Sequence, residues 1–176
     1  MTTIVSPKGN ITIRLATIHD TQAFIALRLK ALKDHPEAFG SDYEDALARP
    51  DEFWQQRLTE SDYNAIYVAV SPEAELIGMT GISRYEGKKI QHNASIVSVY
   101  IDPAWRGLRL TEHLIETCVE WARRHDVRIL RLGVAVTNTA AIRAYTRAGF
   151  SIYGIEQEVI FTGGVYYDEL SMARRL

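Results

Sequence analysis

The sequence has a single cysteine, Cys118, among its 176 residues. One cysteine excludes a disulfide within the chain and fits a reducing compartment. Long apolar runs are also missing: residues 65–70 form one of the longest, far short of the roughly 20 residues that a membrane-spanning helix needs. The N-terminus has no basic segment followed by an apolar core, so no secretory signal is expected. These absences predict a cytoplasmic protein with no membrane partner.

An excess of positive charge is missing as well. The 20 lysines and arginines stand against 22 aspartates and glutamates, so the net charge is only −2. This balance gives no electrostatic basis for a nucleic acid as partner. The five histidines show no ligand spacing such as His-x-x-x-His, so no metal site is expected. The Gly-x-Gly-x-x-Gly and Gly-Lys-Ser/Thr patterns of nucleotide-binding loops are absent too.

The pattern of apolar residues predicts a mixed α/β fold in one domain, residues 1–176. A chain of this length buries roughly 70% of its unfolded surface. Strands are expected at residues 11–15, 65–70, 76–85, 90–101, 129–136, 152–161 and 165–174. The longer helices are expected at about 17–33, 110–124 and 139–147. This order predicts a mostly antiparallel central sheet with flanking helices and one parallel crossover, which leads to a strand 129–136 buried on both faces.

The expected helices differ in the residues on their faces. Thr17 is expected to cap the first long helix, which ends near Lys33. One stripe of this helix is formed by Phe24, Leu27, Arg28 and Ala31. In the helix 110–124, Cys118 lies on the apolar side and is expected to be a small core residue. An acidic row expected to face solvent is formed by Glu112, Glu116 and Glu120.

Residues 99–111 join a strand end, a turn and a helix start. Pro103 removes a ladder donor and closes the strand, and apolar residues recur at helical spacing from Leu110 onward. Between them lies a short basic loop, residues 106–109. Such a loop can aim several backbone N–H groups outward at the positive end of the following helix. The stretch therefore predicts an anion site suited to phosphate, although a turn with a solubilising arginine has the same pattern.

A second stretch, residues 138–150, reads Asn-x-x-Ala-x-x-x-Tyr-x-x-x-Gly-Phe. Together with the strand–Asp-Pro-x-x-Arg-Gly–helix pattern of residues 99–111, it resembles the GNAT superfamily of acyl-CoA-dependent N-acetyltransferases. The first strand, at residues 13–16, and the last, at residues 167–172, are also similar to those of the superfamily. The resemblance thus covers nearly the whole chain and implies a GNAT-like fold.

The resemblance implies acetyl-CoA as co-substrate. The backbone of residues 107–111 would hold the pyrophosphate, because glycine permits close approach. Arg106 matches the family pattern, but Arg109 and Thr111 replace residues that are normally small. Arg109 then either adds a guanidinium to the phosphate shell or weakens binding. The implied cofactor-binding residues are Val99, Tyr100, Ile101, Arg106, Gly107, Leu108, Arg109, Leu110, Thr111, Asn138, Ala141 and Tyr145.

The resemblance also implies roles in the chemistry. Residues 99–101 would pair with the pantetheine amides, and a neighbouring N–H would polarise the thioester carbonyl. Tyr145 would be catalytic, protonating the leaving thiolate, and Asn138 would contact the cofactor arm. The alternatives are ordinary structural roles: a tyrosine packed on the core and an asparagine that caps a helix.

No general base is identified in the sequence. An amine with a pKa near 10 is mostly protonated at neutral pH, so a proton has to be removed. Many members of the superfamily have a glutamate in the strand before the phosphate loop, where this chain has Ser95 and Val97. The resemblance also implies that the loop and short helices at residues 36–53 form the acceptor region.

The expected function is N-acetyltransfer from acetyl-CoA to a primary amine of a small molecule or peptide by direct attack. The altered phosphate loop and the missing carboxylate leave an alternative open, a non-catalytic acyl-CoA-binding module with the same fold. A homodimer is possible, because similar proteins often form one.

Overall fold

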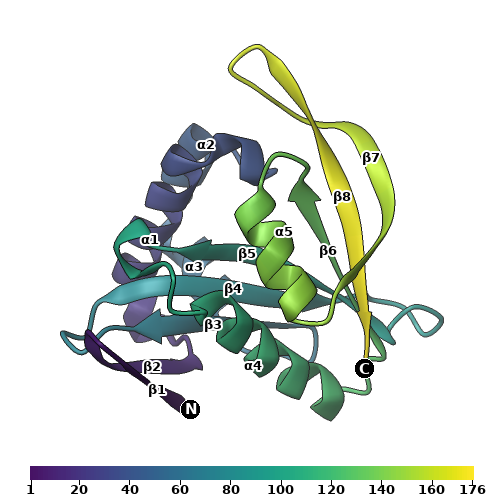
Figure 1. Ribbon diagram of the computed structural model, residues 1–176. Helices are drawn as coiled ribbons and strands as arrows, with labels where there is room; N and C mark the ends of the chain where they lie inside the picture. Colours follow the sequence, from purple (N-terminus) through teal and green to yellow (C-terminus); the bar gives the residue numbers. More distant parts are fainter.

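The computed structural model describes residues 1–176 and is built around one 8-stranded sheet with helices on both faces (Figure 1). The strands are β1 Thr2–Ser6, β2 Gly9–Leu15, β3 Asn64–Val70, β4 Leu76–Arg84, β5 Asn93–Ile101, β6 Ile129–Ala135, β7 Ser151–Thr162 and β8 Val165–Arg175. The helices are α1 Thr21–Asp34, α2 Tyr43–Leu47, α3 Asp51–Leu58, α4 Leu110–Arg124 and α5 Thr139–Arg147. The strand order is β1-β2-β3-β4-β5-β6-β8-β7.

All neighbouring strands are antiparallel except β5 and β6. These two are parallel, as predicted, and pair only where Asn93–Ser95 faces Ile129–Arg131. Beyond this short ladder they diverge, which opens the middle of the sheet (Figure 1). The sheet is therefore continuous at one end of the β5–β6 pair and split at the other.

The two faces of the sheet carry separate apolar cores. Alternation along β3 shows this, because Ile66 and Val68 join one core while Tyr67 joins the other. The core of 12 buried residues packs under α1 to α3, around Phe24 and Trp54. The core of 24 buried residues packs under α4 and α5. The split between β5 and β6 is an opening in the sheet between its two faces.

The helices α4 and α5, which cover the second face of the sheet, begin and end as their sequences predict. The apolar stripe of α4 is buried, including Cys118, and the helix ends at Arg124. The helix α5 ends before Gly149, whose φ of +84° is the left-handed conformation that favours glycine. No helix in the structure is both long and apolar enough to cross a membrane.

Several expected boundaries at the N-terminal half are wrong. The strand β1 was not predicted, and it pairs only with β2 at the sheet edge. Thr17 does not cap α1: its N–H donates to the Asp20 carboxylate at 2.8 Å, which forms a separate 3-10 turn before the helix. The strand β5 begins at Asn93 and not at 90, because the chain before it turns back on Gly87 through backbone hydrogen bonds.

Two expectations about exposure are also wrong. The strand β6 is not buried on both faces, because Gly133 is exposed. The acidic row of α4 is not simply solvated: Glu112 pairs with Arg147 at 2.7 Å, and Glu116 pairs with Arg174 at 3.0 Å. These pairs fasten α4 to α5 and β8, so the row contributes to the packing of the second face.

Candidate active site

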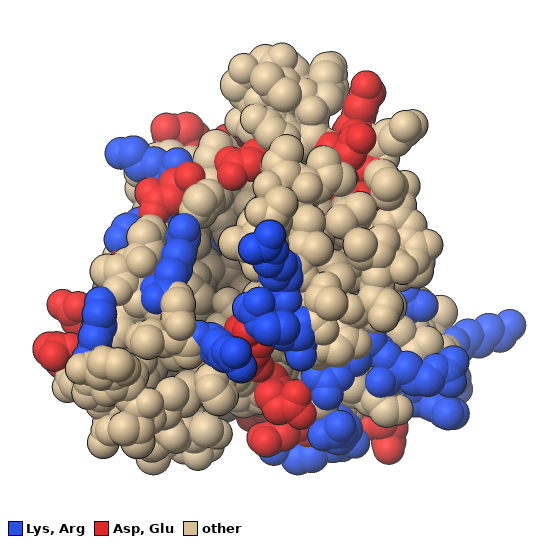
Figure 2. Space-filling model, viewed as in Figure 1, with Lys and Arg blue, Asp and Glu red and all other residues tan.

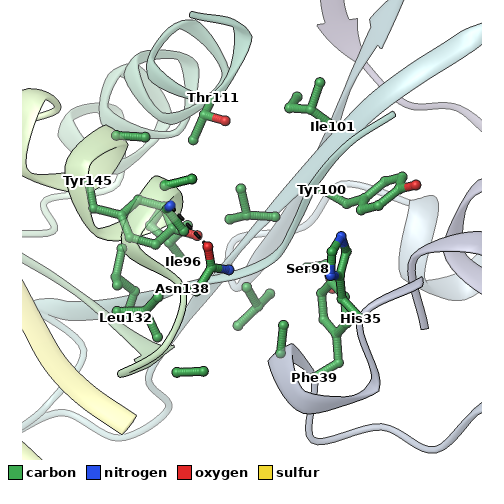
Figure 3. Close-up of a pocket in the computed structure, with 18 of the residues that line it drawn as sticks. His35, Phe39, Ile96, Ser98, Tyr100, Ile101, Thr111, Leu132, Asn138 and Tyr145 are labelled. Carbon is green, nitrogen blue, oxygen red and sulfur yellow. Dashed lines mark hydrogen bonds between the residues drawn. The ribbon is translucent and has the colours of Figure 1, made fainter. Parts of the chain in front are cut away.

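A cavity of about 860 Å³ lies at the split between β5 and β6. It takes residues from both faces of the sheet and from both motifs of the sequence. In Figure 3, Tyr145 and Asn138 lie on one side of the cavity, and His35 and Phe39 lie on the other, with β5 between them. One continuous space thus connects the α4–α5 face with the α1–α3 face.

The loop before α4 presents unused backbone donors to this cavity. The N–H groups from Gly107 through Glu112 donate no backbone hydrogen bond, since they lie in the loop and the first helical turn. Gly107 has a φ of +84°, and a Cβ built on it would meet nothing within 4 Å. Arg109 is also left-handed, at φ 55°. Figure 2 shows Lys and Arg side chains along both sides of a hollow on this face, and Arg106, Arg109 and Arg147 line the cavity. The loop is therefore suited to a multivalent anion.

The strand β5 contributes a free backbone edge and a bulge. Its pairing with β6 stops at Ser95, so residues 96–101 have no strand partner on that side. Against β4 the register shifts so that Ser98 and Val99 together oppose Thr80. Ser98 has a φ of 57°, which turns the strand at this point. The free edge can pair with an extended ligand that carries amide groups.

The side chains at the end of β5 point to different faces. Tyr100 packs in the core under α1, where its hydroxyl donates to Asp34 at 2.8 Å. Val99 and Ile101 pack on the α4 side. Burial, followed by the bond to Asp34, raises the pKa of Tyr100 above its ordinary value. Tyr100 can therefore offer a ligand its backbone, while its hydroxyl is already engaged.

The two arginines of the loop differ in their contacts. Arg106 is turned toward the protein: its Nε donates to the Ile101 carbonyl at 3.2 Å, and Nη2 lies 2.9 Å from His35 Nε2. Arg109 joins none of the ion pairs of the protein and is exposed. Leu110 is buried, so only its backbone faces the loop. Arg109 is thus the arginine of this loop whose guanidinium is free.

The second motif positions Asn138 and Tyr145 on α5. Asn138 caps the helix, because its Oδ1 accepts a hydrogen bond from the N–H of Ala141 at 3.1 Å (Figure 3). Its side-chain amide remains available as a donor. Tyr145 is 7% exposed and packs near Phe150, with ring centroids 6.4 Å apart. Burial, followed by the charge of Glu169, raises the pKa of Tyr145 above its ordinary value of 10.0. Its hydroxyl is therefore protonated at neutral pH, as that of an exposed tyrosine would be.

Glu169 is a cavity residue that sequence reasoning missed. It lies on β8 beside β6, so close to Gly133 that a Cβ there would lie 2.4 Å from its Oε2. Burial, followed by the charge of Glu156, raises its pKa. The other carboxylate that lines the cavity, Glu112, is already paired with Arg147. Glu169 lies near the end of the chain and reaches the cavity through strand pairing, which no local motif reveals.

Arg28 and Arg57 also line the cavity, on the α1–α3 face, and were not predicted to do so. Arg28 is 7% exposed, and its Nη2 donates to Ser41 Oγ at 3.1 Å. Burial, followed by the charge of Arg57, lowers the pKa of Arg28 to about 10. The sequence held one signal for a special role of Arg28: it lies on the apolar stripe of α1, where a charged residue is unusual.

The arrangement joins an anion-binding loop, a free strand edge, a protonated phenol and an unpaired carboxylate in one cavity. Such groups can hold an elongated phosphorylated ligand, accept a proton at one point and donate one at another. No cluster of metal-ligating side chains is present.

Comparison with known proteins identifies relatives that match most of the chain. The model of the Acetyltransferase (GNAT) family matches residues 28–150. A mycothiol acetyltransferase of Brachybacterium faecium is 33% identical over 137 residues, 77% of this chain. This chain spans only 39% of that protein. The L-amino acid N-acetyltransferase AaaT of Escherichia coli is 28% identical over 171 residues, which cover 94% of this chain and 98% of AaaT.

A solved structure with the same fold is that of yncA from Salmonella typhimurium, a putative acetyltransferase with its cofactor acetyl-CoA. Its TM-score is 0.77 at 22% identity, covering 96% of this chain and 95% of yncA. The family match covers both motifs that line the cavity. This chain therefore belongs to the GNAT family of acetyltransferases, which use acetyl-CoA as co-substrate.

Proposed function

We propose that this protein transfers the acetyl group of acetyl-CoA to a primary amine by direct attack, as a single domain acting in the cytoplasm. The observation that carries the proposal is the continuous cavity between β5 and β6. It joins the unused N–H groups of the loop before α4 to Tyr145 and Glu169.

The residues present fit acetyl-CoA. The N–H groups of residues 107–112 would bind the pyrophosphate, aided by the N-terminus of α4 and the free Arg109. The free edge of β5 would pair with the pantetheine amides. The amide side chain of Asn138 would add one donor to the same arm. Arg106 would contribute through its backbone, because its guanidinium is bound to Ile101 and His35.

The proposed reaction forms one C–N bond and breaks one C–S bond. The amine attacks the thioester carbonyl, whose oxygen is polarised by a backbone N–H at the bulge of β5. Glu169 takes the proton that the amine loses, because it is the unpaired cavity carboxylate and its raised pKa makes it a better base. Tyr145 gives a proton to the leaving thiolate, so that CoA departs as the thiol. The proton taken up by Glu169 returns to Tyr145 through solvent, so the N-acetyl product and CoA are the net products.

The names of the two relatives point to different acceptors: one is called a mycothiol acetyltransferase and the other an L-amino acid N-acetyltransferase. The latter matches this chain along nearly its full length. We propose a small-molecule or peptide amine as acceptor of this chain.

Release of free thiol from acetyl-CoA, measured with a panel of amines, tests the proposal. Amine-dependent release above the rate without amine is the expected result. The alternative is a non-catalytic acyl-CoA-binding module. That module would bind acetyl-CoA in a calorimetric titration and yet release no thiol with any amine of the panel.

We also propose that the protein forms a homodimer through β7 and β8. β7 is an edge strand of the sheet, and the hairpin residues 159–167 carry no charge. Ile155, Phe161 and Tyr166 are 62%, 61% and 60% exposed. In Figure 2 the projecting end of the molecule shows no Lys or Arg. An exposed uncharged apolar surface on an edge strand is suited to a second copy of itself.

A further inference from the structure

The guanidinium of Arg28 is buried without a counter-charge. Arg28 takes part in no ion pair, and neither does Arg57. Arg28 Nη1 is fully buried and has no hydrogen-bond partner. The charge of Arg28 is stabilised by a hydrogen bond to the neutral hydroxyl of Ser41 and by a cation–π contact with Phe39, whose ring lies 4.6 Å from the guanidinium carbon. A buried charge without an anionic partner is costly for a folded protein.

The nearby carboxylates do not neutralise it. Asp42 and Asp45 line a smaller cavity of about 250 Å³ that Arg28 and Arg57 also line. Asp42 caps α2, where its Oδ1 accepts N–H groups at 2.8 and 3.1 Å. Asp45 forms no ion pair. Burial, followed by the like charge of Arg57, lowers the pKa of Arg28.

The position of Arg28 separates it from the phosphate loop. Arg28 packs with the helices α1 to α3, whereas the loop before α4 serves the opposite face. Both line the same large cavity, which passes through the split in the sheet. An acetyl-CoA held at the loop therefore enters from one face. This leaves the side of the cavity lined by Arg28 and Arg57 open to the amine.

We propose that Arg28, assisted by Arg57 and Ser41, binds a compact anionic group on the acceptor itself, so that the acceptor is an amine with a nearby carboxylate, as in an α-amino acid. This inference rests on the proposed function. A planar guanidinium with an unused N–H matches a carboxylate, which supplies both the missing hydrogen-bond acceptor and the missing charge. A phosphinate or phosphonate beside the amine offers the same chemistry. Its anion would fix the acceptor while the amine points toward the thioester.

The test compares each of several L-amino acids with its own carboxamide as acceptor, at saturating acetyl-CoA. The wild-type protein is expected to prefer the amino acid. Arg28→Gln is expected to reduce kcat/KM for the amino acid by about 30-fold, mainly through KM, because a buried charge pair is lost. The rate with the carboxamide should change by less than about threefold, since it has no anion to lose. Arg28→Lys should recover part of the loss.

Arg49→Gln is the matched control. Arg49 lines only the smaller cavity, is exposed, and stacks over Phe53 at 5.0 Å. This variant should keep the preference of the wild type. Acetyl-CoA affinity and melting temperature are measured for each variant, which separates a local effect from a folding defect. Arg57→Gln is a second variant that should weaken the preference for the amino acid over its carboxamide.

Equal or better rates with carboxamides or peptides in the wild type would overturn the anion site and leave acetyl transfer intact. An equal loss for both members of a pair in Arg28→Gln, with folding preserved, would overturn it as well. If no amine is acetylated, the proposed function fails separately. Calorimetry with the acetyl-CoA-loaded protein then decides the anion site, because binding of amino acids that does not depend on Arg28 refutes it.

Discussion

At the residue scale, Tyr145 is the proposed proton donor to the leaving thiolate. Its phenol is protonated at neutral pH, and the ring lies in the cavity near Glu169. Tyr145→Phe should lower kcat by about 100-fold or more, as expected when a general acid is removed. The ring still packs near Phe150, so the melting temperature and acetyl-CoA affinity should change little. An unchanged kcat would assign Tyr145 to the core alone.

Glu169 and Glu156 make a pH-dependent pair. The base form of Glu169 is the carboxylate, so activity should rise with pH through its pKa, which burial and Glu156 place above the ordinary value. Glu156→Gln removes the like charge and should move the acidic limb of the kcat/KM profile to lower pH. Glu169→Gln should remove that limb and most of the activity. A profile that is identical in wild type and Glu156→Gln would contradict the role of Glu169.

Arg109 departs from the small residue that the family pattern has at its position. If its free guanidinium reaches the phosphates, Arg109→Ala loses about 1.5–3 kcal/mol of binding free energy and acetyl-CoA affinity falls about 10- to 100-fold. Arg109→Gly loses the same contact but relieves the left-handed φ of 55°. Calorimetry should therefore show weaker binding for both variants. Tighter binding by both would show that Arg109 only crowds the loop.

At the scale of elements, an ion pair connects the strand β2 to the turn that precedes the helix α1. Arg14 on β2 and Asp20 before α1 form two hydrogen bonds of 2.7 Å. The bond to Arg14 is the main reason why the pKa of Asp20 is lowered from 3.8 to about 2. A lowered carboxyl pKa stabilises the fold above the unfolded pKa, and that stability is lost as the pH falls through the folded pKa.

The free energy of unfolding of the wild type is expected to fall between about pH 4 and pH 2. The fall should be smaller in Asp20→Asn, which has no carboxyl group to protonate at this position. Urea unfolding of both proteins across this range measures it. The variant should be less stable than the wild type at pH 7, and the difference should shrink toward pH 2. A difference that is constant with pH would contradict the ion pair as its source.

Elements that depend on local sequence were predicted well. The helix α4 follows from its apolar stripe, and α5 follows from Asn138 at its start and Gly149 at its end. The strand β1 was missed although Thr2–Val5 are all β-branched, because this run is short; it pairs only with β2 at the edge of the sheet. The exposed face of β6 was missed because it faces the cavity, which forms only when β5 and β6 diverge.

At the scale of the whole molecule, the mixed α/β fold was predicted from the pattern of apolar residues, and the family, the acyltransferase class and acetyl-CoA as co-substrate were predicted from the two motifs. The comparisons confirm these predictions. For the acceptor side only a region was expected, residues 36–53, and neither Arg28 nor Glu169 was expected to line the cavity. Arg28 and Glu169 lie far apart in the sequence, and the topology of the sheet brings them to the same cavity.

The proposed homodimer is also a property of the whole molecule. Ile155→Glu places a charge on the exposed face of the edge strand β7, where the wild type is apolar. The variant should be monomeric in light scattering coupled to size exclusion, while the wild type should be a dimer. Lys88→Glu, on the exposed turn between β4 and β5, changes a charge elsewhere and should leave the mass unchanged. A monomeric wild type would contradict the proposal.

A single-turnover experiment tests most directly whether one cavity holds acetyl-CoA and passes its acetyl group to an amine. The protein loaded with acetyl-CoA is mixed with an α-amino acid, and mass spectrometry follows CoA and the N-acetyl product together. The two products are expected to appear at the same rate and in equal amounts. CoA released without N-acetyl product, or acetyl-CoA that stays intact with every amino acid and amine offered, would contradict acetyl transfer.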